Sequence, residues 1–78
     1  KITWRLASAM LAAARIAASF MVATRAIVRE AHDWAVHRDA VVVHAPREFP
    51  EYGEHYATYF LDPHGFMLEV VCHGPDET

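Results

Sequence analysis

The sequence has 78 residues, a formal net charge of −3 and one cysteine, Cys72. This length allows one small domain, the lone cysteine excludes an internal disulfide, and the acidic balance argues against nucleic-acid binding. A reduced thiol is typical of the cytoplasm, which is therefore the predicted location. Apolar residues make up 54% of the chain. Because so small a domain is marginally stable alone, this composition favours a homodimer that buries part of the apolar surface.

The first residues are predicted to be an N-terminal remnant or an alanine-rich helix, spanning residues 1–14. The apolar run from Leu6 to Ala14 also resembles the core of a short signal peptide. Arg15 follows this run at once and argues against that alternative. Arg15 also keeps the run below the length of a transmembrane helix, so no membrane association is expected.

The pattern of residues 15–22 is ambiguous, whereas the segments that follow have clearer patterns. Alanines in residues 15–22 favour a helix, whereas Phe20, Met21 and Val22 favour a strand. Thr24 is a predicted N-cap for a helix over residues 25–37, where apolar residues recur at helical spacing. Residues 40–44 are predicted to form a strand, residues 45–54 a proline-containing loop, and residues 74–78 a polar tail.

A β-hairpin is predicted over residues 56–71. Its turn is Asp62-Pro63-His64-Gly65, where aspartate, proline and glycine each favour a turn for a different backbone reason. If these four residues are the whole loop, Leu61 pairs with Phe66 and Thr58 lies opposite Glu69. A slip of one residue would exchange the two faces of the first strand.

With that register, one face of the hairpin is mixed and is expected to line a cavity; its members are Tyr56, Thr58, Phe60, Met67, Glu69, Val71 and His73. The other face is more apolar and is expected to pack on the helix around Trp34; it comprises Ala57, Tyr59, Phe66, Leu68, Val70 and Cys72. The same register places His55 away from the cavity.

Glu69 is the candidate functional residue because it interrupts the apolar run Met67-Leu68-Glu69-Val70-Val71. A buried carboxylate needs a cation or hydrogen-bond donors. A metal ion is one partner, and local donors such as Tyr56, Thr58 or solvent are the alternative. The six histidines do not have the spacing of a known zinc motif.

The expected element order is helix, strand, strand, strand, with a further strand before the helix if residues 16–22 are extended. That order predicts an α+β fold with a mixed or antiparallel sheet and the helix packed on one face.

Asp-Pro-x-Gly followed by an apolar strand with Glu69 resembles the closing hairpin of the vicinal oxygen chelate superfamily, which includes glyoxalases, bleomycin-resistance-type proteins and extradiol dioxygenases. The resemblance extends through residues 46–53 and covers roughly residues 15–73. It implies a C-terminal βαβββ module with a first strand over residues 16–22. It also implies that Glu69 matches the carboxylate that ligates a divalent metal ion (Zn, Ni, Fe or Mn) in the metal-dependent members.

On this basis the expected function is a glyoxalase/dioxygenase-like, metal-dependent lyase or dioxygenase module. It would act on a small substrate with vicinal oxygens, in an active site assembled in a homodimer. Glu69 would be the metal ligand and catalytic residue, and the residues contacting substrate would be Tyr56, Thr58, Phe60, Met67 and His73.

The sequence also departs from the family pattern. Metal-dependent members usually have a histidine on the first strand, where this chain has Arg15, Ala17, Ala18 and Ser19. Two alternatives therefore stay open: a metal-free, bleomycin-resistance-like module that binds a small ligand, and a truncated half-domain without activity.

Overall fold

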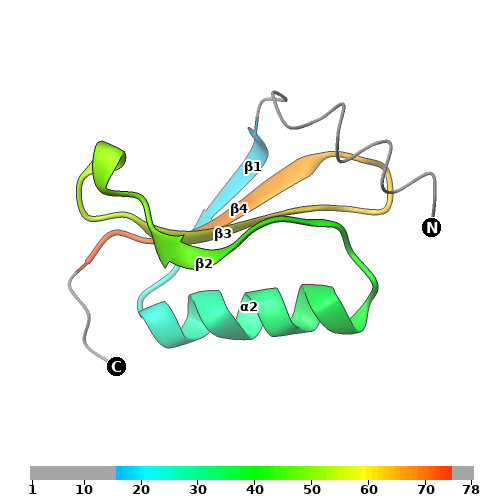
Figure 1. Cartoon of the computed structure of the whole chain (residues 1–78), viewed down its shortest axis with the longest axis horizontal. Coiled ribbons are helices and arrows are strands. Elements are labelled where there is room, and N and C mark those ends of the chain that lie inside the picture. Colours follow the sequence, from blue (N-terminus) through cyan, green and yellow to red (C-terminus); the bar gives the residue numbers. More distant parts are fainter. Residues whose placement is uncertain (1–15, 75–78) are drawn as a thin grey trace.

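The computed structural model describes residues 16–74 (Figure 1). The elements follow the order strand, helix and three further strands, with a short 3₁₀ turn between the second and third strands. Their bounds are β1 Ile16–Met21, α2 Arg25–His37, β2 Val42–Glu48, η1 Pro50–Tyr52, β3 Tyr56–Leu61 and β4 Met67–Cys72. The predicted remnant over residues 1–14 and most of the predicted tail lie outside the described residues.

The four strands form one mixed sheet in the order β1-β4-β3-β2. β1 pairs with β4 in parallel, and β4 with β3 and β3 with β2 are antiparallel pairs. Helix α2 covers one face of this sheet (Figure 1). The predicted α+β fold and its βαβββ element order are thereby confirmed.

The helix begins where the sequence predicts. Thr24 is extended, and its side-chain oxygen accepts a hydrogen bond from the Ile27 amide at 3.2 Å. Val28 and Ala35 are fully buried and pack with Phe60 and other residues of the sheet. Trp34 is 52% exposed and its ring lies 6.5 Å from that of Phe60, so the buried centre of this packing is at Val28 and Ala35. Of the residues predicted to face the helix, Leu68, Val70 and Cys72 do so, whereas the prediction is wrong for Ala57 and Tyr59, which lie on the opposite face, and for the exposed Phe66.

The second strand is longer than predicted and runs into the expected loop. β2 continues through Pro46 to Glu48, with register shifts between Val42 and His44 and between His44 and Arg47. A proline is tolerated here because β2 is an edge strand and because bulged positions do not need every ladder hydrogen bond.

The hairpin register differs by one residue from the prediction. Leu61 pairs with Met67, and Tyr59, not Thr58, lies opposite Glu69. Asp62 explains the difference. Its amide donates to the Phe66 carbonyl, and its side chain accepts hydrogen bonds from the amides of His64 and Phe66, each 2.9 Å long. Phe66 therefore belongs to the loop, and the four-residue loop that we predict is wrong.

This register sorts the hairpin into two packed faces. On the α2 side lie Tyr56, Phe60, Leu68, Val70 and Cys72, packed with the helix. On the other side Phe49, Ala57, Tyr59, Leu61, Met67 and Val71 form a second cluster. The sheet is therefore packed on both faces. In residues 16–74, no helix is apolar and long enough to cross a bilayer.

Candidate ligand-binding site around Glu69

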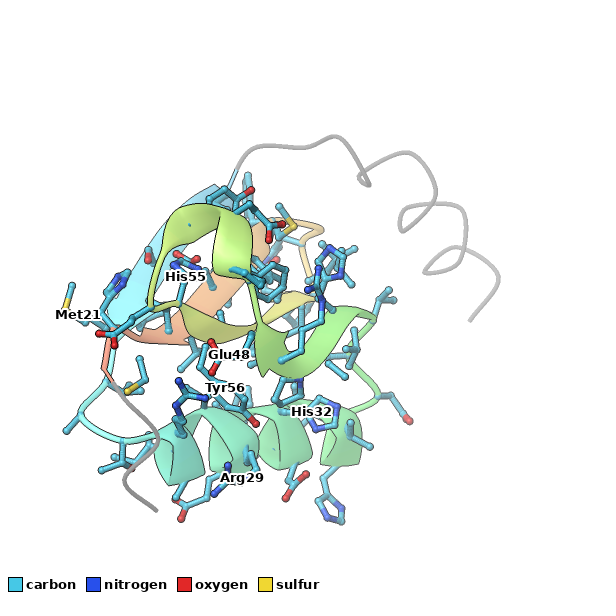
Figure 2. All side chains as sticks on the ribbon, turned by 60° about the vertical axis from the view of Figure 1, so that its left-hand side comes forward. Met21, Arg29, His32, Glu48, His55 and Tyr56 are labelled. Atoms are coloured by element: carbon cyan, nitrogen blue, oxygen red, sulfur yellow. The ribbon has the colours of Figure 1, made fainter. Side chains whose placement is uncertain are left out.

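A cavity of about 560 Å³ opens on the sheet face opposite to α2. Every strand and the η1 turn contribute to its wall; the lining residues are Ile16, Val43, His44, Arg47, Phe49, Glu51, Tyr52, His55, Tyr59, Met67 and Glu69. Figure 2 shows His55 between η1 and the sheet, and Tyr56 on the α2 side. The cavity thus combines aromatic walls with a few converging polar groups, which is the usual make-up of a small-molecule site.

Glu69 forms the polar centre of this cavity and is only 6% exposed. The Ser19 hydroxyl donates to its Oε1 at 2.5 Å, and the Tyr59 hydroxyl donates to its Oε2 at 2.6 Å. His55 Nε2 lies 2.9 Å from the same Oε2 and 3.1 Å from the Tyr59 oxygen. With a proton on Nε2, His55 is a third donor, so both carboxylate oxygens are satisfied by side chains.

The sheet register places these donors. Glu69 lies on β4, directly between Ser19 on β1 and Tyr59 on β3. Side chains of directly paired residues project to the same face, so both hydroxyls reach the carboxylate. His55 immediately precedes β3 and lies two positions before Ala57, on the same face. Donors from β1, 50 residues away, and from residues 55–59 of the same hairpin thus meet at one acid.

The hydrogen bonds shift the acidities of the two central groups. Burial alone would raise the pKa of Glu69, but the hydrogen bonds from Ser19 and Tyr59, together with the charge and hydrogen bond of His55, hold this pKa below its ordinary value. Burial, followed by the hydrogen bond to the Glu69 carboxylate, strongly raises the pKa of Tyr59. The site therefore holds an ionised carboxylate beside a neutral phenol that remains a hydrogen-bond donor at physiological pH.

Of the predicted site residues, Glu69 and Met67 line the cavity. His73 lies beside it: its exposed ring is 5.1 Å from the ring of His55, and its Nδ1 is 3.3 Å from the Glu54 carbonyl oxygen. It is not one of the lining residues.

The cavity positions that we predict for Tyr56, Thr58 and Phe60 are wrong. The one-residue shift turns all three to the α2 side. Phe60 packs there with the helix, and the hydroxyl of Thr58 donates to the His44 carbonyl at 2.8 Å. Tyr56 lies under the guanidinium of Arg25, 4.8 Å from its ring centre.

Sequence reasoning missed three residues that hold Glu69: Ser19, His55 and Tyr59. Two of them follow from the register. A loop of five residues would have placed Tyr59 opposite Glu69 and His55 on the same face. Ser19 could be found only from the pairing of β1 with β4, which joins segments 50 residues apart.

The fit of a metal ion can be judged from the donor set. Within residues 16–74, no group of three or more histidine, cysteine, aspartate or glutamate side chains is placed to hold an ion. His55 and Glu69 are two side chains of these types. The third side chain beside them, from β1, is Ser19, whose hydroxyl is not one of these ligand types. These residues of one chain fall short of a complete divalent site, which takes three or more protein ligands.

Comparisons with known proteins show the fold alone. Neither a protein-family model nor a curated protein matches the sequence. Among solved structures, the chain is similar to "NAD-dependent benzaldehyde dehydrogenase from Legionella pneumophila", with a TM-score of 0.60 and 22% identity. The match covers 69% of this chain and 45% of that chain, so the present chain spans less than half the length of the protein that it resembles. At this identity the shared feature is the arrangement of helix and strands.

Proposed function

We propose that this chain is a vicinal-oxygen-chelate-like module that binds a small ligand in the cavity around Glu69, without a metal ion. The observation that supports the proposal is that both oxygens of the Glu69 carboxylate have hydrogen-bond partners within the chain. Ser19, Tyr59 and His55 approach its two oxygens at 2.5 to 2.9 Å, at the polar centre of a cavity of about 560 Å³. A carboxylate already satisfied by three donors does not need a cation to be buried.

The cavity wall indicates the chemistry of the ligand. Phe49, Val43 and Met67 provide apolar and aromatic contacts that suit a flat, largely apolar body. At the polar centre, the Tyr59 hydroxyl donates its one proton to Glu69, so what a ligand meets there is the acceptor oxygens of the carboxylate. The cavity wall thus favours a ligand with an apolar ring or chain at one end, and the resemblance to vicinal oxygen chelate proteins adds the expectation of neighbouring oxygen atoms, carried as hydroxyl donors, at the other.

The fold supports the family part of the proposal. The β1-α2-β2-β3-β4 order and the position of Glu69 in the last strand are those that the resemblance to vicinal oxygen chelate proteins implies. A cytoplasmic location is part of the proposal and is supported by the unpaired, buried thiol of Cys72.

A metal-dependent glyoxalase/dioxygenase-like activity is the second candidate. His55 Nε2 and Glu69 Oε2 are 2.9 Å apart and both border the cavity. Two ligands of one ion, each about 2.1 Å from it and at a right angle, are separated by about 3 Å. A second copy of the chain would have to supply the missing ligands. The remaining alternative is a half-domain without activity.

The test measures metal content and ligand binding together. Untagged protein is analysed for bound metals, and its nuclear magnetic resonance spectrum is followed while small aromatic compounds with vicinal oxygens are added. Glu69→Gln removes the charge at the polar centre, and Glu54→Gln, outside the cavity lining, is the matched control. We expect substoichiometric metal and ligand-induced shifts at Met67 and Tyr59.

Near-stoichiometric divalent metal that is lost in Glu69→Gln, but kept in Glu54→Gln, would replace the metal-free proposal with the metal-dependent one. Metal-free protein whose cavity signals respond to none of the compounds would favour the half-domain.

A further inference from the structure

Two charged side chains line the cavity besides Glu69: Arg47 on β2 and Glu51 on η1, and both are exposed. The carboxylate of Glu69 already has its donors within the chain. Neither Arg47 nor Glu51 forms an ion pair with another residue of the described range 16–74. A ligand in the cavity therefore meets one unpaired charge of each sign.

Strand β2 turns Arg47 toward the cavity and the next residue, Glu48, away from it. Arg47 pairs with Ala57, which lies on the cavity side, whereas Glu48 pairs with Tyr56, on the α2 side. There Glu48 forms an ion pair with Arg25, and Figure 2 shows Glu48 beside Tyr56. The acid next to Arg47 in the sequence is thus engaged on the opposite face of the sheet, which leaves the charge of Arg47 to the cavity.

The guanidinium of Arg47 is held against the cavity wall. Its central carbon lies 3.8 Å from the ring centre of Phe49, a buried residue that also lines the cavity. Its Nη1 donates to the Glu48 carbonyl at 2.7 Å, and the group has further N–H donors. A planar guanidinium presents parallel N–H groups that match the two oxygens of a carboxylate, which makes it a strong anion-binding group.

His44 adds a second nitrogen-bearing side chain to the same wall. It pairs with Tyr59, lines the cavity, and meets the rings of Phe49 and Tyr59 edge to face, at 5.4 and 5.6 Å between ring centres. The β2 wall thus presents N–H donors, whereas Glu69 presents acceptor oxygens. A ligand that satisfies both carries an acceptor group at one end and a hydroxyl donor at the other.

We propose that the ligand of this cavity is an anion whose carboxylate binds the guanidinium of Arg47, with His44 as a second donor. This inference rests on the proposed function and adds the charge of the ligand to it. Arg47 is the better anchor of the two unpaired charges, because the Phe49 ring and the Glu48 carbonyl fix its guanidinium. No hydrogen bond within residues 16–74 fixes the Glu51 carboxylate in the same way. Glu51 then repels the bound anion, so Arg47 and Glu51 have opposite effects on its affinity.

Three catechols that differ in a single ring substituent test the proposal. A carboxylate, a carboxamide or an aminomethyl group at the same ring position makes the compound an anion, neutral or a cation. Their dissociation constants for the untagged protein are measured by nuclear magnetic resonance titration. Arg47→Gln removes the proposed anchor. Arg38→Gln is the matched control, because Arg38 is an exposed arginine that stacks on Trp34 outside the cavity lining.

We expect the wild-type protein to bind the carboxylate compound at least ~5-fold more tightly than the carboxamide, since hydrogen bonds between charged groups are stronger than neutral ones. Arg47→Gln should remove this preference by weakening the binding of the carboxylate compound alone, and Arg38→Gln should leave the preference unchanged. Glu51→Gln should tighten binding of the carboxylate compound about twofold, through loss of an exposed like charge.

Equal binding of the carboxylate and the carboxamide, unchanged by Arg47→Gln, would overturn the anion proposal while supporting the proposed function. Tighter binding of the aminomethyl compound that is lost in Glu51→Gln would overturn it in favour of a cationic ligand. If none of the three compounds shifts the cavity signals, the anion proposal and the proposed function are both overturned. The comparison of the three compounds on the wild-type protein needs no variant, so the test stays decisive even if Arg47→Gln fails to fold.

Discussion

Tyr59→Phe is the sharpest test of the hydrogen-bond network around Glu69. The substitution removes one oxygen and keeps the ring, which packs against Phe49 at 5.2 Å and His44 at 5.6 Å between ring centres. It deletes the 2.6 Å hydrogen bond to the carboxylate and the 3.1 Å contact with His55 Nε2, while Ser19 and His55 still donate to Glu69. The loss is therefore that of one hydrogen bond to a charged acceptor, without a cavity in the core.

Hydrogen bonds to charged groups contribute about 1.5–3 kcal/mol. We expect the free energy of unfolding at neutral pH to fall by that amount, measured by urea denaturation followed by circular dichroism. Tyr52→Phe is the control, because Tyr52 is exposed and stacks on Phe49 without a hydrogen bond to Glu69. Its effect should stay within about 0.5 kcal/mol.

The pH dependence of the stability difference between wild type and Tyr59→Phe is a second, independent test. The pKa of Glu69 is lowered in the folded protein, so its carboxylate stabilises the fold above the ordinary value of 4.5, and this contribution is lost as the pH falls through the lowered pKa. Without the Tyr59 hydroxyl, one cause of the lowering disappears and the contribution shrinks. The difference between wild type and variant should thus be largest at neutral pH and smaller in acid. A pH-independent difference, or one below about 0.5 kcal/mol, would refute this account of the network.

Three further substitutions test the fold that holds the site, each by urea denaturation. Leu61→Ala, at a fully buried position of the cavity-side cluster, should cost about 2–5 kcal/mol, and a cost below about 1 kcal/mol would show that this cluster is loosely packed. Thr24→Ala should cost about 1 kcal/mol through loss of the helix cap, whereas Thr24→Ser should keep most of the stability; equal losses would argue against the cap. Asp62→Ala should cost about 1–2 kcal/mol, because two loop amides lose their acceptor, and Asp62→Asn, which keeps an acceptor oxygen, should cost less; the reverse order would contradict the assigned role of the side chain.

Local patterns in the sequence were sufficient for much of the fold. The Thr24 cap and the spacing of Val28 and Ala35 predict the helix, and Asp62 with Gly65 predicts the turn. These features depend on neighbours within a few residues, where backbone preferences and side-chain hydrogen bonds act directly. The position of Glu69 within an apolar strand likewise indicates the candidate site without reference to any tertiary contact.

The structure, and not the sequence pattern, decided which residues surround Glu69. The side chain of Asp62 draws Phe66 into the turn, and this one added residue reverses the faces of β3, so that Tyr59 and not Thr58 meets the acid. Ser19 reaches Glu69 only because β1 crosses over α2 and pairs in parallel with β4. Sequence periodicity fixes which residues can share a face, but the loop length and the crossover set which face it is. The loop length depends on the hydrogen bonds of Asp62 with His64 and Phe66, whereas the crossover depends on contacts between β1 and β4, which are far apart in the chain.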